Sequence, residues 1–239
     1  FAMTAVTALT AQDTLGVHGV HPIPPAFVAS QMAVVLEDLG ADVVKTGMLH
    51  DAAIIEAVVD ALDRSAPAVP IVVDPVLVAK GGASLLSVDA IAALLARLVP
   101  RASVLTPNAP EAEALTGVRV ADAAGMLAAA EALLARGAGA VLLKGGHVAG
   151  GTVRDLLLTA SGPVWREAPR IDTASTHGTG CTLASALAIG LAQGRPLEEA
   201  WSRAHAYVRG AILAAPGFGR GHGPLDHGWE LGRATSARG

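Results

Sequence analysis

Short apolar runs alternate with longer amphipathic segments along the first part of the chain. The apolar runs are long enough for strands and cover residues 4–9, 42–46, 69–73, 102–105 and 140–143. Between them, apolar residues recur at intervals of three and four, which predicts helices over 24–39, 54–62, 91–98 and 126–134. Strands that alternate with helices are typical of parallel sheets. The pattern therefore predicts an α/β fold with a mostly parallel, doubly wound sheet and helices on both faces.

The pattern changes after residue 150. Two stretches, 152–159 and 163–166, flank Ser161-Gly162 and predict an antiparallel hairpin at the edge of the sheet. Two further helices are predicted over residues 180–193 and 197–214. Because no internal repeat, linker or change of composition divides the sequence, we expect one domain over residues 1–239.

The composition narrows the class of protein. The chain is 52% hydrophobic and carries a net charge of -4 over its 239 residues, which is typical of a compact, soluble protein. It offers no basic surplus for nucleic acid or anionic membrane, and no apolar run approaches the roughly 20 residues of a membrane-spanning helix. The single cysteine excludes an intramolecular disulfide and suits a reducing compartment, so we expect a cytoplasmic protein.

Polar side chains follow the predicted parallel strands at the points where the strands end. They are Gln12, Lys45, Asp74, Asn108 and Lys144, with Gly47 and Met48 directly after the second strand. The carboxyl ends of parallel strands meet at one edge of a sheet, and ligands bind beyond that edge. We therefore expect these residues to form one functional rim.

Each of these residues also has a purely structural interpretation. Asp74 precedes a proline and could begin a turn, while Gln12 could belong to a surface loop. Asn108, with Glu111 three residues later, resembles a helix capping box. Met48 could pack in the core, and Lys144 could be a solvated charge at the end of a strand.

The only cysteine, Cys181, directly follows the turn Gly178-Thr179-Gly180 at the start of a predicted helix. Glycine allows close approach of the backbone to a ligand, and the first amides of a helix have no intrahelical partner. Together with the helix dipole they favour an anion, most often phosphate. The same surroundings are expected to lower the pKa of a thiol, which makes Cys181 a candidate base. Without this context a lone cysteine is most often a small core residue.

Several other motifs are absent from the sequence. It contains no Gly-x-x-x-x-Gly-Lys-Ser/Thr phosphate loop and no early Gly-x-Gly-x-x-Gly dinucleotide fingerprint. It also lacks a Gly-x-Ser-x-Gly nucleophile elbow and any cysteine–histidine cluster with zinc spacing. The glycine turn before Cys181 is therefore a different type of anion site.

A set of short strings gives the sequence a more specific resemblance. The strings are TALTAQ at 7–12, GVHGV at 16–20, KTGML at 45–49, DPVLVAK at 74–80, TPNAPEAE at 106–113, LKGGH at 143–147, HGTGCT at 177–182 and GHGPL at 221–225. Together they resemble the ribokinase-like superfamily, whose sugar kinases carry an aspartate base at the position of Cys181. With cysteine there, they resemble the hydroxymethylpyrimidine/phosphomethylpyrimidine kinases of thiamine biosynthesis. The strings span nearly the whole chain and are highly specific as a set.

The resemblance implies a kinase that uses MgATP to phosphorylate 4-amino-5-hydroxymethyl-2-methylpyrimidine and then its monophosphate. Catalysis would involve Cys181 as base or orienting thiol, the amides of Gly178 and Gly180, and Lys144 as counter-charge. The implied pyrimidine-binding residues are Gln12, Gly47, Met48 and Val76. The implied ATP-binding residues are Lys144, Asn108, Thr176 and Thr179, and the implied Mg²⁺ ligands are Asp74, Glu111 and Asn108. The resemblance also implies a homodimer. The glycine-rich residues 217–223 could be part of a flap over the nucleotide.

The sequence departs from the family at two places. Family members begin with a strand and a glycine-rich segment that helps to close over the pyrimidine, and no equivalent precedes Phe1. We expect that segment to lie upstream of the numbered residues. Asp13 stands where family members often carry asparagine after the Thr-Ala-Gln string.

Three other functions remain as alternatives. A pyridoxal kinase of the same fold also phosphorylates a hydroxymethyl group on a flat heterocycle, and no residue here separates the two. A catalytically idle sensor would bind the pyrimidine without turnover, although Asp74, Lys144 and Cys181 argue against it. A sugar kinase is disfavoured because cysteine replaces the aspartate. The sequence also leaves open whether one or both phosphoryl transfers occur.

Overall fold

The computed structural model describes residues 1–77 and 87–231, so residues 78–80 of the string at 74–80 lie outside the described part. Its centre is a six-stranded sheet in which the strands follow one another in chain order. The strands are β3 (Val44–Thr46), β4 (Ile71–Val73), β5 (Val104–Leu105), β6 (Val141–Leu143), β7 (Thr152–Thr159) and β8 (Gly162–Pro169). Strands β3 to β6 are parallel, and β7 and β8 form the predicted antiparallel hairpin at one edge.

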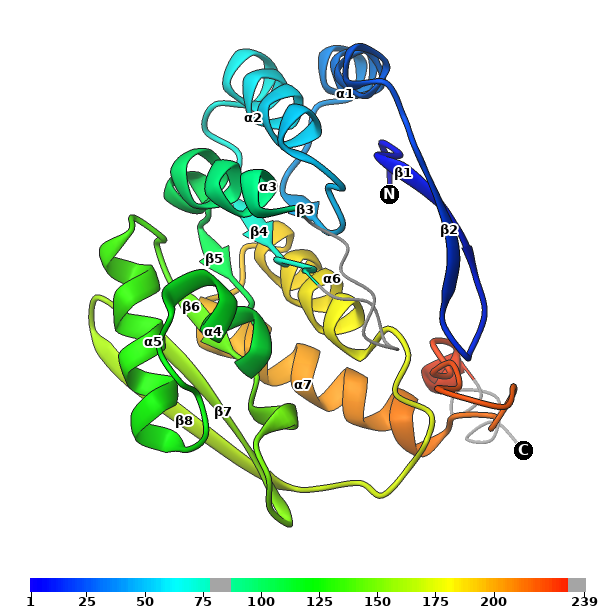
Figure 1. The fold of residues 1–239 in the computed structure, drawn as a ribbon, viewed down its shortest axis with the longest axis vertical. Coiled ribbons are helices and arrows are strands. Elements are labelled where there is room, and N and C mark those ends of the chain that lie inside the picture. The colour runs from blue at the N-terminus through cyan, green and yellow to red at the C-terminus, as the bar shows by residue number, and fades with distance from the viewer. Residues whose placement is uncertain (78–86, 232–239) are drawn as a thin grey trace.

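Each face of the sheet has its own apolar core, because neighbouring residues of a strand point to opposite faces. Ile71 and Val73 pack in one core, whereas Val72 packs in the other. The first core is covered by α1 (Pro25–Asp38), α2 (Ala52–Ser65), α3 (Val88–Ala93), α4 (Ala109–Thr116) and α5 (Ala123–Ala135). The second is covered by α6 (Thr179–Ala192) and α7 (Leu197–Leu213) (Figure 1). The prediction of a doubly wound sheet is therefore confirmed.

The helices differ from the predicted ones at two places. The helix predicted over 91–98 begins earlier, as α3, and continues as a π-helical turn (Leu94–Leu98) and a 3-10 turn (Val99–Arg101). Helix α4 was indicated in the sequence only by the possible capping box of Asn108 and Glu111, because its eight residues are too few to show a clear helical period. A further 3-10 turn (Gly145–His147) follows β6, and Lys144 is the N-cap residue of this turn.

The prediction for the first strand is wrong in both position and partner. The sequence predicts residues 4–9 as part of the parallel sheet, but β1 (Ala8–Gln12) pairs antiparallel with β2 (Val17–Pro22) in a separate two-stranded sheet. The turn between them is fixed by Asp13, whose carboxylate accepts hydrogen bonds from the amides of Leu15 and Gly16. Gln12 therefore ends a strand of this hairpin, and an apolar run alone does not reveal with which strand it will pair.

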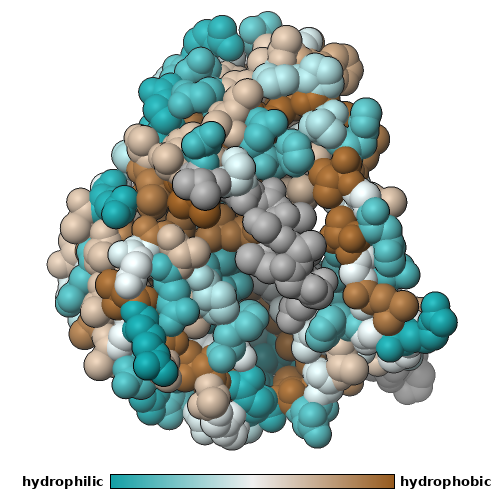
Figure 2. All heavy atoms as spheres, in the orientation of Figure 1, coloured by the Kyte–Doolittle hydropathy of each residue, from teal (hydrophilic) through white to brown (hydrophobic). Residues whose placement is uncertain are grey.

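The hairpin β1–β2 lies along one side of the molecule and is exposed on both of its faces. Figure 2 shows apolar residues gathered along this side. Leu9 and Val20 of the hairpin and Phe27 and Val34 of α1 are among the exposed large apolar side chains. Within the described ranges, no helix is long and apolar enough to cross a membrane.

Candidate active site

The rim predicted from the strand ends is present, with Asp74 at its centre. Asp74 follows β4 and is 2% exposed. Its Oδ1 atom accepts hydrogen bonds from the Lys144 Nζ at 3.0 Å and from the Thr106 Oγ1 at 3.2 Å. Its Oδ2 atom lies 3.6 Å from the Lys45 Nζ and has no hydrogen-bond partner within the described residues. Every parallel strand thus contributes, at or just beyond its end, to one buried carboxylate.

Asp74 and Lys144 keep each other charged. Burial alone would raise the pKa of Asp74, but the positive charges of Lys144 and Lys45 outweigh burial and lower the pKa. Burial alone would lower the pKa of Lys144, and the carboxylates of Asp74 and Glu111 raise it instead. The rim therefore holds a fixed ammonium group at neutral pH.

The backbone around Lys144 is held from both sides. The Lys144 amide donates to the Pro107 carbonyl at 2.8 Å, and Asn108 and Lys144 form a parallel bridge beyond the ends of β5 and β6. The next amide, that of Gly145, donates to the buried carboxylate of Asp155 at 2.8 Å. These bonds extend the sheet by one residue, so that the Lys144 side chain reaches Asp74.

Asn108 and Glu111 form the capping box of α4, so their structural interpretation is confirmed. The Asn108 Oδ1 accepts from the Glu111 amide at 2.9 Å, and the Glu111 Oε2 accepts from the Asn108 amide at 2.7 Å. The same Oε2 lies 4.0 Å from the Lys144 Nζ, and burial raises the pKa of the Glu111 carboxyl. The pair therefore starts a helix and also adds a second carboxylate to the rim.

The glycine turn lies at the N-terminus of α6, as predicted. Gly178 is the N-cap residue and has a φ of +80°, a left-handed conformation that glycine adopts without strain. A Cβ atom on Gly180 would lie 3.0 Å from the Lys144 Nζ, so the glycine lets the ammonium approach the first turn of the helix. Backbone amides and a lysine thus face the same space, which is suited to an anion.

The predicted direction of the Cys181 pKa is wrong. The sequence argument expects a lowered value at a helix N-terminus, but burial of the thiol and then the negative charge of Asp74 raise the pKa. The charges of Lys45 and Lys144 act the other way and do not outweigh them. Cys181 keeps exposed surface, so the group offered to a ligand is an accessible thiol rather than a thiolate. The expected lowering left out the burial of the sulfur and the carboxylate beside it, which together outweigh the helix N-terminus.

Thr176 and Thr179 lie on the two sides of His177 and Gly178 and close the turn. The Thr179 hydroxyl donates to the Thr176 carbonyl at 3.2 Å, and the Thr176 hydroxyl lies 3.3 Å from the His222 Nδ1. Both hydroxyls are engaged within the protein. The two hydroxyls therefore stabilise the shape of the turn.

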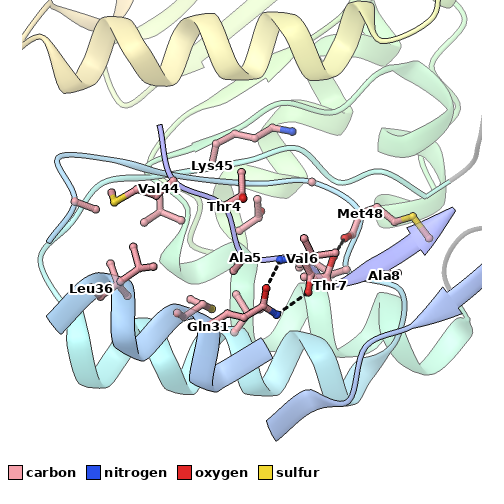
Figure 3. A pocket seen from close by; sticks show the side chains of 18 of the residues that line it. Thr4, Ala5, Val6, Thr7, Ala8, Gln31, Leu36, Val44, Lys45 and Met48 are labelled. Atoms are coloured by element: carbon pink, nitrogen blue, oxygen red, sulfur yellow. Dashed lines mark hydrogen bonds between the residues drawn. The ribbon is translucent and has the colours of Figure 1, made fainter. Parts of the chain in front are cut away.

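The residues predicted to bind the pyrimidine come from separate segments. Gln12 ends β1, and Gly47 and Met48 follow β3. Val76 follows Asp74, and its amide donates to the Asp74 carbonyl at 2.9 Å. Met48 is half-buried, and its carbonyl accepts from the Thr7 hydroxyl at 2.7 Å (Figure 3). The structure brings Met48, Val76 and the rim to the same end of the sheet, while Gln12 reaches out on the hairpin.

Two cavities flank the rim. One, of about 500 Å³, lies between residues 3–8, α1 and residues 43–49, and it includes Gly47, Met48 and Lys45 (Figure 3). The other, of about 550 Å³, lies beside the glycine turn and is lined from α6 by Cys181 and from α7 by Tyr207. Neither includes Asp74 or Lys144, so neither by itself is the centre of the predicted chemistry.

Sequence reasoning placed Lys45 on the rim without assigning it a specific role, and it missed Thr106. Lys45 is a lysine within an apolar strand, and this exception was the signal that it serves the site. Thr106 follows β5 directly and donates to Asp74. A threonine at the end of a buried strand carries no specific signal, so only the structure identifies it.

Comparison with known proteins identifies the family. A family profile described as phosphomethylpyrimidine kinase matches residues 1–226. The chain belongs to the phosphomethylpyrimidine kinase family. The hydroxymethylpyrimidine/phosphomethylpyrimidine kinase of Streptomyces coelicolor is 48% identical over 210 residues, which cover 88% of this chain and 77% of that protein. The kinase of the same name from Haemophilus influenzae is 44% identical over 237 residues, which cover 98% of this chain and 87% of the relative.

A longer relative carries the matched region as one part. The thiamine biosynthesis bifunctional protein ThiED of Geobacter sulfurreducens is 49% identical over 205 residues. These residues cover 86% of this chain but 42% of that protein, so the chain spans less than half of this relative.

Solved structures agree with the family. The pyridoxal kinase of Bacillus subtilis, in an ADP complex, has a TM-score of 0.87 at 31% identity and covers 96% of this chain with 86% of its own. The phosphomethylpyrimidine kinase of Clostridium difficile 630 has a TM-score of 0.77 at 34% identity, with coverages of 89% and 87%. The predictions of a ribokinase-like fold and of a phosphotransferase of this family are confirmed.

Proposed function

We propose that the chain transfers the γ-phosphoryl group of ATP to the hydroxymethyl oxygen of 4-amino-5-hydroxymethyl-2-methylpyrimidine. A second transfer to the monophosphate then gives the diphosphate used in thiamine biosynthesis. The names of the relatives support the substrate, and the ADP complex of a structural neighbour supports the nucleotide. The observation that carries the reaction is the Asp74–Lys144 pair packed against the glycine turn before Cys181.

The turn and Lys144 serve the transferring group. Phosphoryl transfer depends mainly on positioning and on stabilising the charge that builds on the phosphoryl oxygens. The amides of Gly178, Gly180 and Cys181 donate to these oxygens, whereas the Thr179 amide donates to the Thr176 carbonyl at 3.4 Å. The Lys144 ammonium compensates the charge of the phosphoryl oxygens. Thr176 and Thr179 of the loop and Asn108 at the start of α4 contribute to ATP binding in this proposal.

Cys181 accepts the proton of the alcohol, while Asp74 stays ionised. Because the pKa of Cys181 is raised, its thiol orients the hydroxymethyl group rather than removing the proton beforehand. As the oxygen–phosphorus bond forms, the alcohol proton passes to the Cys181 sulfur and the proton of the accessible thiol passes to water, so that Asp74 stays ionised beside Lys144. Proton transfer that accompanies bond formation, and does not precede it, fits a loose transition state, in which the nucleophile needs little activation before transfer.

The rim also suits Mg²⁺ bound together with ATP. When bound, the Mg²⁺ ion would neutralise charge at the phosphates. The Oδ2 atom of Asp74 is a buried carboxylate oxygen that no hydrogen bond occupies within the described part of the chain, and Glu111 lies nearby. The Asn108 Oδ1 already accepts the cap bond and fits an outer position. Across residues 1–77 and 87–231 no three His, Cys, Asp or Glu side chains form a protein-only metal cage. Mg²⁺ commonly binds through one or two carboxylates, substrate phosphates and water, so the rim fits this mode.

The pyrimidine is bound between the rim and the hairpin β1–β2. The Gln12 amide can both donate and accept, which matches the amino group and ring nitrogen of an aminopyrimidine. Met48 and Val76 offer apolar contact to the ring. Gly47 leaves space in front of the Lys45 ammonium, because a Cβ atom on Gly47 would lie 3.0 Å from the Lys45 Nζ.

The proposal includes one kinase domain over residues 1–239, a homodimer and a cytoplasmic location. Exposed Leu9, Phe27 and Val34 on the hairpin and α1 support self-association. The single free cysteine supports a reducing compartment.

Pyridoxal is the second candidate substrate, because a pyridoxal kinase is among the solved structures that match most of the chain. The test is ADP formation with hydroxymethylpyrimidine, its monophosphate and pyridoxal supplied separately. We expect kcat/KM for the pyrimidine to exceed that for pyridoxal by at least about tenfold, which corresponds to about 1.4 kcal/mol of transition-state binding. A preference for pyridoxal, or binding of the pyrimidine without ADP formation, would contradict the proposal.

A further inference from the structure

The hairpin β1–β2 is anchored at its ends and not along its length. Every residue of β1 after Ala8 and of β2 after Val17 is exposed. Near the base, the Thr7 hydroxyl donates to the Met48 carbonyl and Val6 exchanges two hydrogen bonds with the Gln31 side chain (Figure 3). An isolated two-stranded hairpin is at best marginally stable in water. The position of Gln12, close to the tip, therefore depends on what holds the tip.

The tip is held by Thr14, which contacts a segment more than two hundred residues away in sequence. We call residues 217–227 the strap. The Thr14 Oγ1 accepts hydrogen bonds from the amides of Arg220 at 3.1 Å and Gly221 at 3.3 Å. The Thr14 carbonyl accepts from the amide of His222 at 2.7 Å. Three successive amides of the strap thus converge on one residue of the hairpin turn, which lies beside the strap in Figure 1.

The glycines of the strap are required by this contact. A Cβ atom on Gly219 would lie 2.4 Å from the Thr14 side chain, and Gly219 also has a φ of +87°. A Cβ atom on Gly221 would lie 2.2 Å from the Thr14 carbonyl oxygen. Side chains at either position would push the hairpin away. The glycine-rich composition of the strap therefore reflects close packing against Thr14.

The other end of the strap is attached to the glycine turn. The His177 amide donates to the Gly223 carbonyl at 3.0 Å, and the Gly223 amide donates to the Ala174 carbonyl at 3.2 Å. The Thr182 hydroxyl lies 3.0 Å from the His227 Nε2 and also donates to the Gly178 carbonyl at 2.7 Å. The strap thus contacts residues on both sides of the turn that ends at Cys181.

We propose that Thr14 is a positioning residue, which seats the hairpin on the strap and so fixes Gln12 relative to the glycine turn. Thr14 lies two residues after Gln12, and the hairpin ladder shifts register between Ala11 and Gln12, so the tip contact decides where the Gln12 side chain lies. Thr14 touches no reacting atom in this account. The effect on substrate rests on the proposed function, because it requires Gln12 to bind the pyrimidine.

The test compares two substitutions of one side chain. Thr14→Val keeps the branched shape and removes the accepting oxygen, whereas Thr14→Ser keeps the oxygen and is the matched control. We expect Thr14→Val to raise KM for hydroxymethylpyrimidine about tenfold, which corresponds to the loss of one to two hydrogen bonds. The KM for ATP should stay within about twofold of the wild-type value. Thr14→Ser should restore the wild-type KM. Gly221→Ala, which places a methyl group against the Thr14 carbonyl, should reproduce Thr14→Val.

Hydrogen exchange of the full chain gives a readout that does not depend on the substrate. In Thr14→Val the amides of Arg220, Gly221 and the hairpin should exchange at least about tenfold faster than in wild type, with α5 unchanged. Failure of the wild-type protein to phosphorylate the pyrimidine would count against the proposed function, while the exchange data would still test the tip contact. Unchanged exchange and unchanged KM in Thr14→Val would overturn the inference. Equal changes in both KM values with a lowered Tm would also overturn it, because they indicate a general structural role.

Discussion

The rim and the hairpin carry the two parts of the proposed site, and they are built in opposite ways. On the rim, Asp74 is buried and contacted by Lys144 and Thr106, and the sheet extends around it by backbone bonds. On the hairpin, Gln12 is exposed and depends on anchors at the base and tip. Groups that act on a transferring phosphoryl group must be placed to within a fraction of an ångström, whereas a group that recognises substrate can arrive on a mobile element.

This difference predicts which quantity each substitution will change. A change on the rim removes charge from a site that the surrounding strands cannot rearrange, so it should lower kcat and also stability. A change on the hairpin should alter KM for the pyrimidine and leave the rest of the molecule intact.

Asp74→Asn is expected to affect both chemistry and stability. The substitution removes the carboxylate that compensates Lys144 and Lys45, so we expect kcat to fall roughly 10³-fold and the free energy of unfolding to fall by about 3 kcal/mol. Steady-state kinetics and urea unfolding measure the two effects. The control is Glu56→Gln, which breaks an exposed ion pair with Arg97 and should change stability by less than about 1 kcal/mol. Activity within tenfold of wild type for Asp74→Asn would place the chemistry elsewhere.

Gly180→Ala tests the contact between the turn and Lys144. The added methyl group would lie 3.0 Å from the Lys144 Nζ and should displace the ammonium, which we expect to lower kcat roughly 10- to 100-fold. Gly151→Ala is the control, because a Cβ atom there meets nothing within 4 Å. Equal kcat values for the two variants would show that the close approach of Lys144 to the turn is not needed.

Gln12→Leu should change recognition and not chemistry. Loss of the amide leaves the polar edge of the pyrimidine unpaired, so we expect KM for the pyrimidine to rise at least about tenfold. The KM for ATP in the same variant is the internal control and should stay within about twofold. A parallel rise in both KM values would remove Gln12 from the pyrimidine site.

The pH dependence of stability is the smallest expected effect. The pKa of Asp74 is lowered in the folded protein from its ordinary value of 3.8. A lowered folded pKa stabilises the protein fully above pH 3.8 and progressively less as the pH falls through the lower folded value. The difference in unfolding free energy between wild type and Asp74→Asn should therefore shrink below that pH. Urea titrations at neutral and acid pH would contradict this if the difference stayed constant.

Much of the fold could be predicted from the sequence, because the parallel strands are short apolar runs buried on both faces. The rim could be predicted for the same reason, since Asp74 and Lys144 directly follow those runs and Asn108 lies three residues after another. The hairpin could not, because its strands are exposed and lack the alternation of a half-buried strand. The direction of the Cys181 pKa could not either, because it depends first on burial of the sulfur in the folded chain and then on Asp74, more than a hundred residues away in sequence.

The rate of a single turnover in Cys181→Ala tests the central claim most directly, because it isolates phosphoryl transfer from product release. With ATP and pyrimidine saturating, we expect the rate to fall at least about 100-fold while the Kd for ATP stays within about twofold of wild type. A rate near that of wild type would show that the thiol beside the glycine turn takes no part in the transfer.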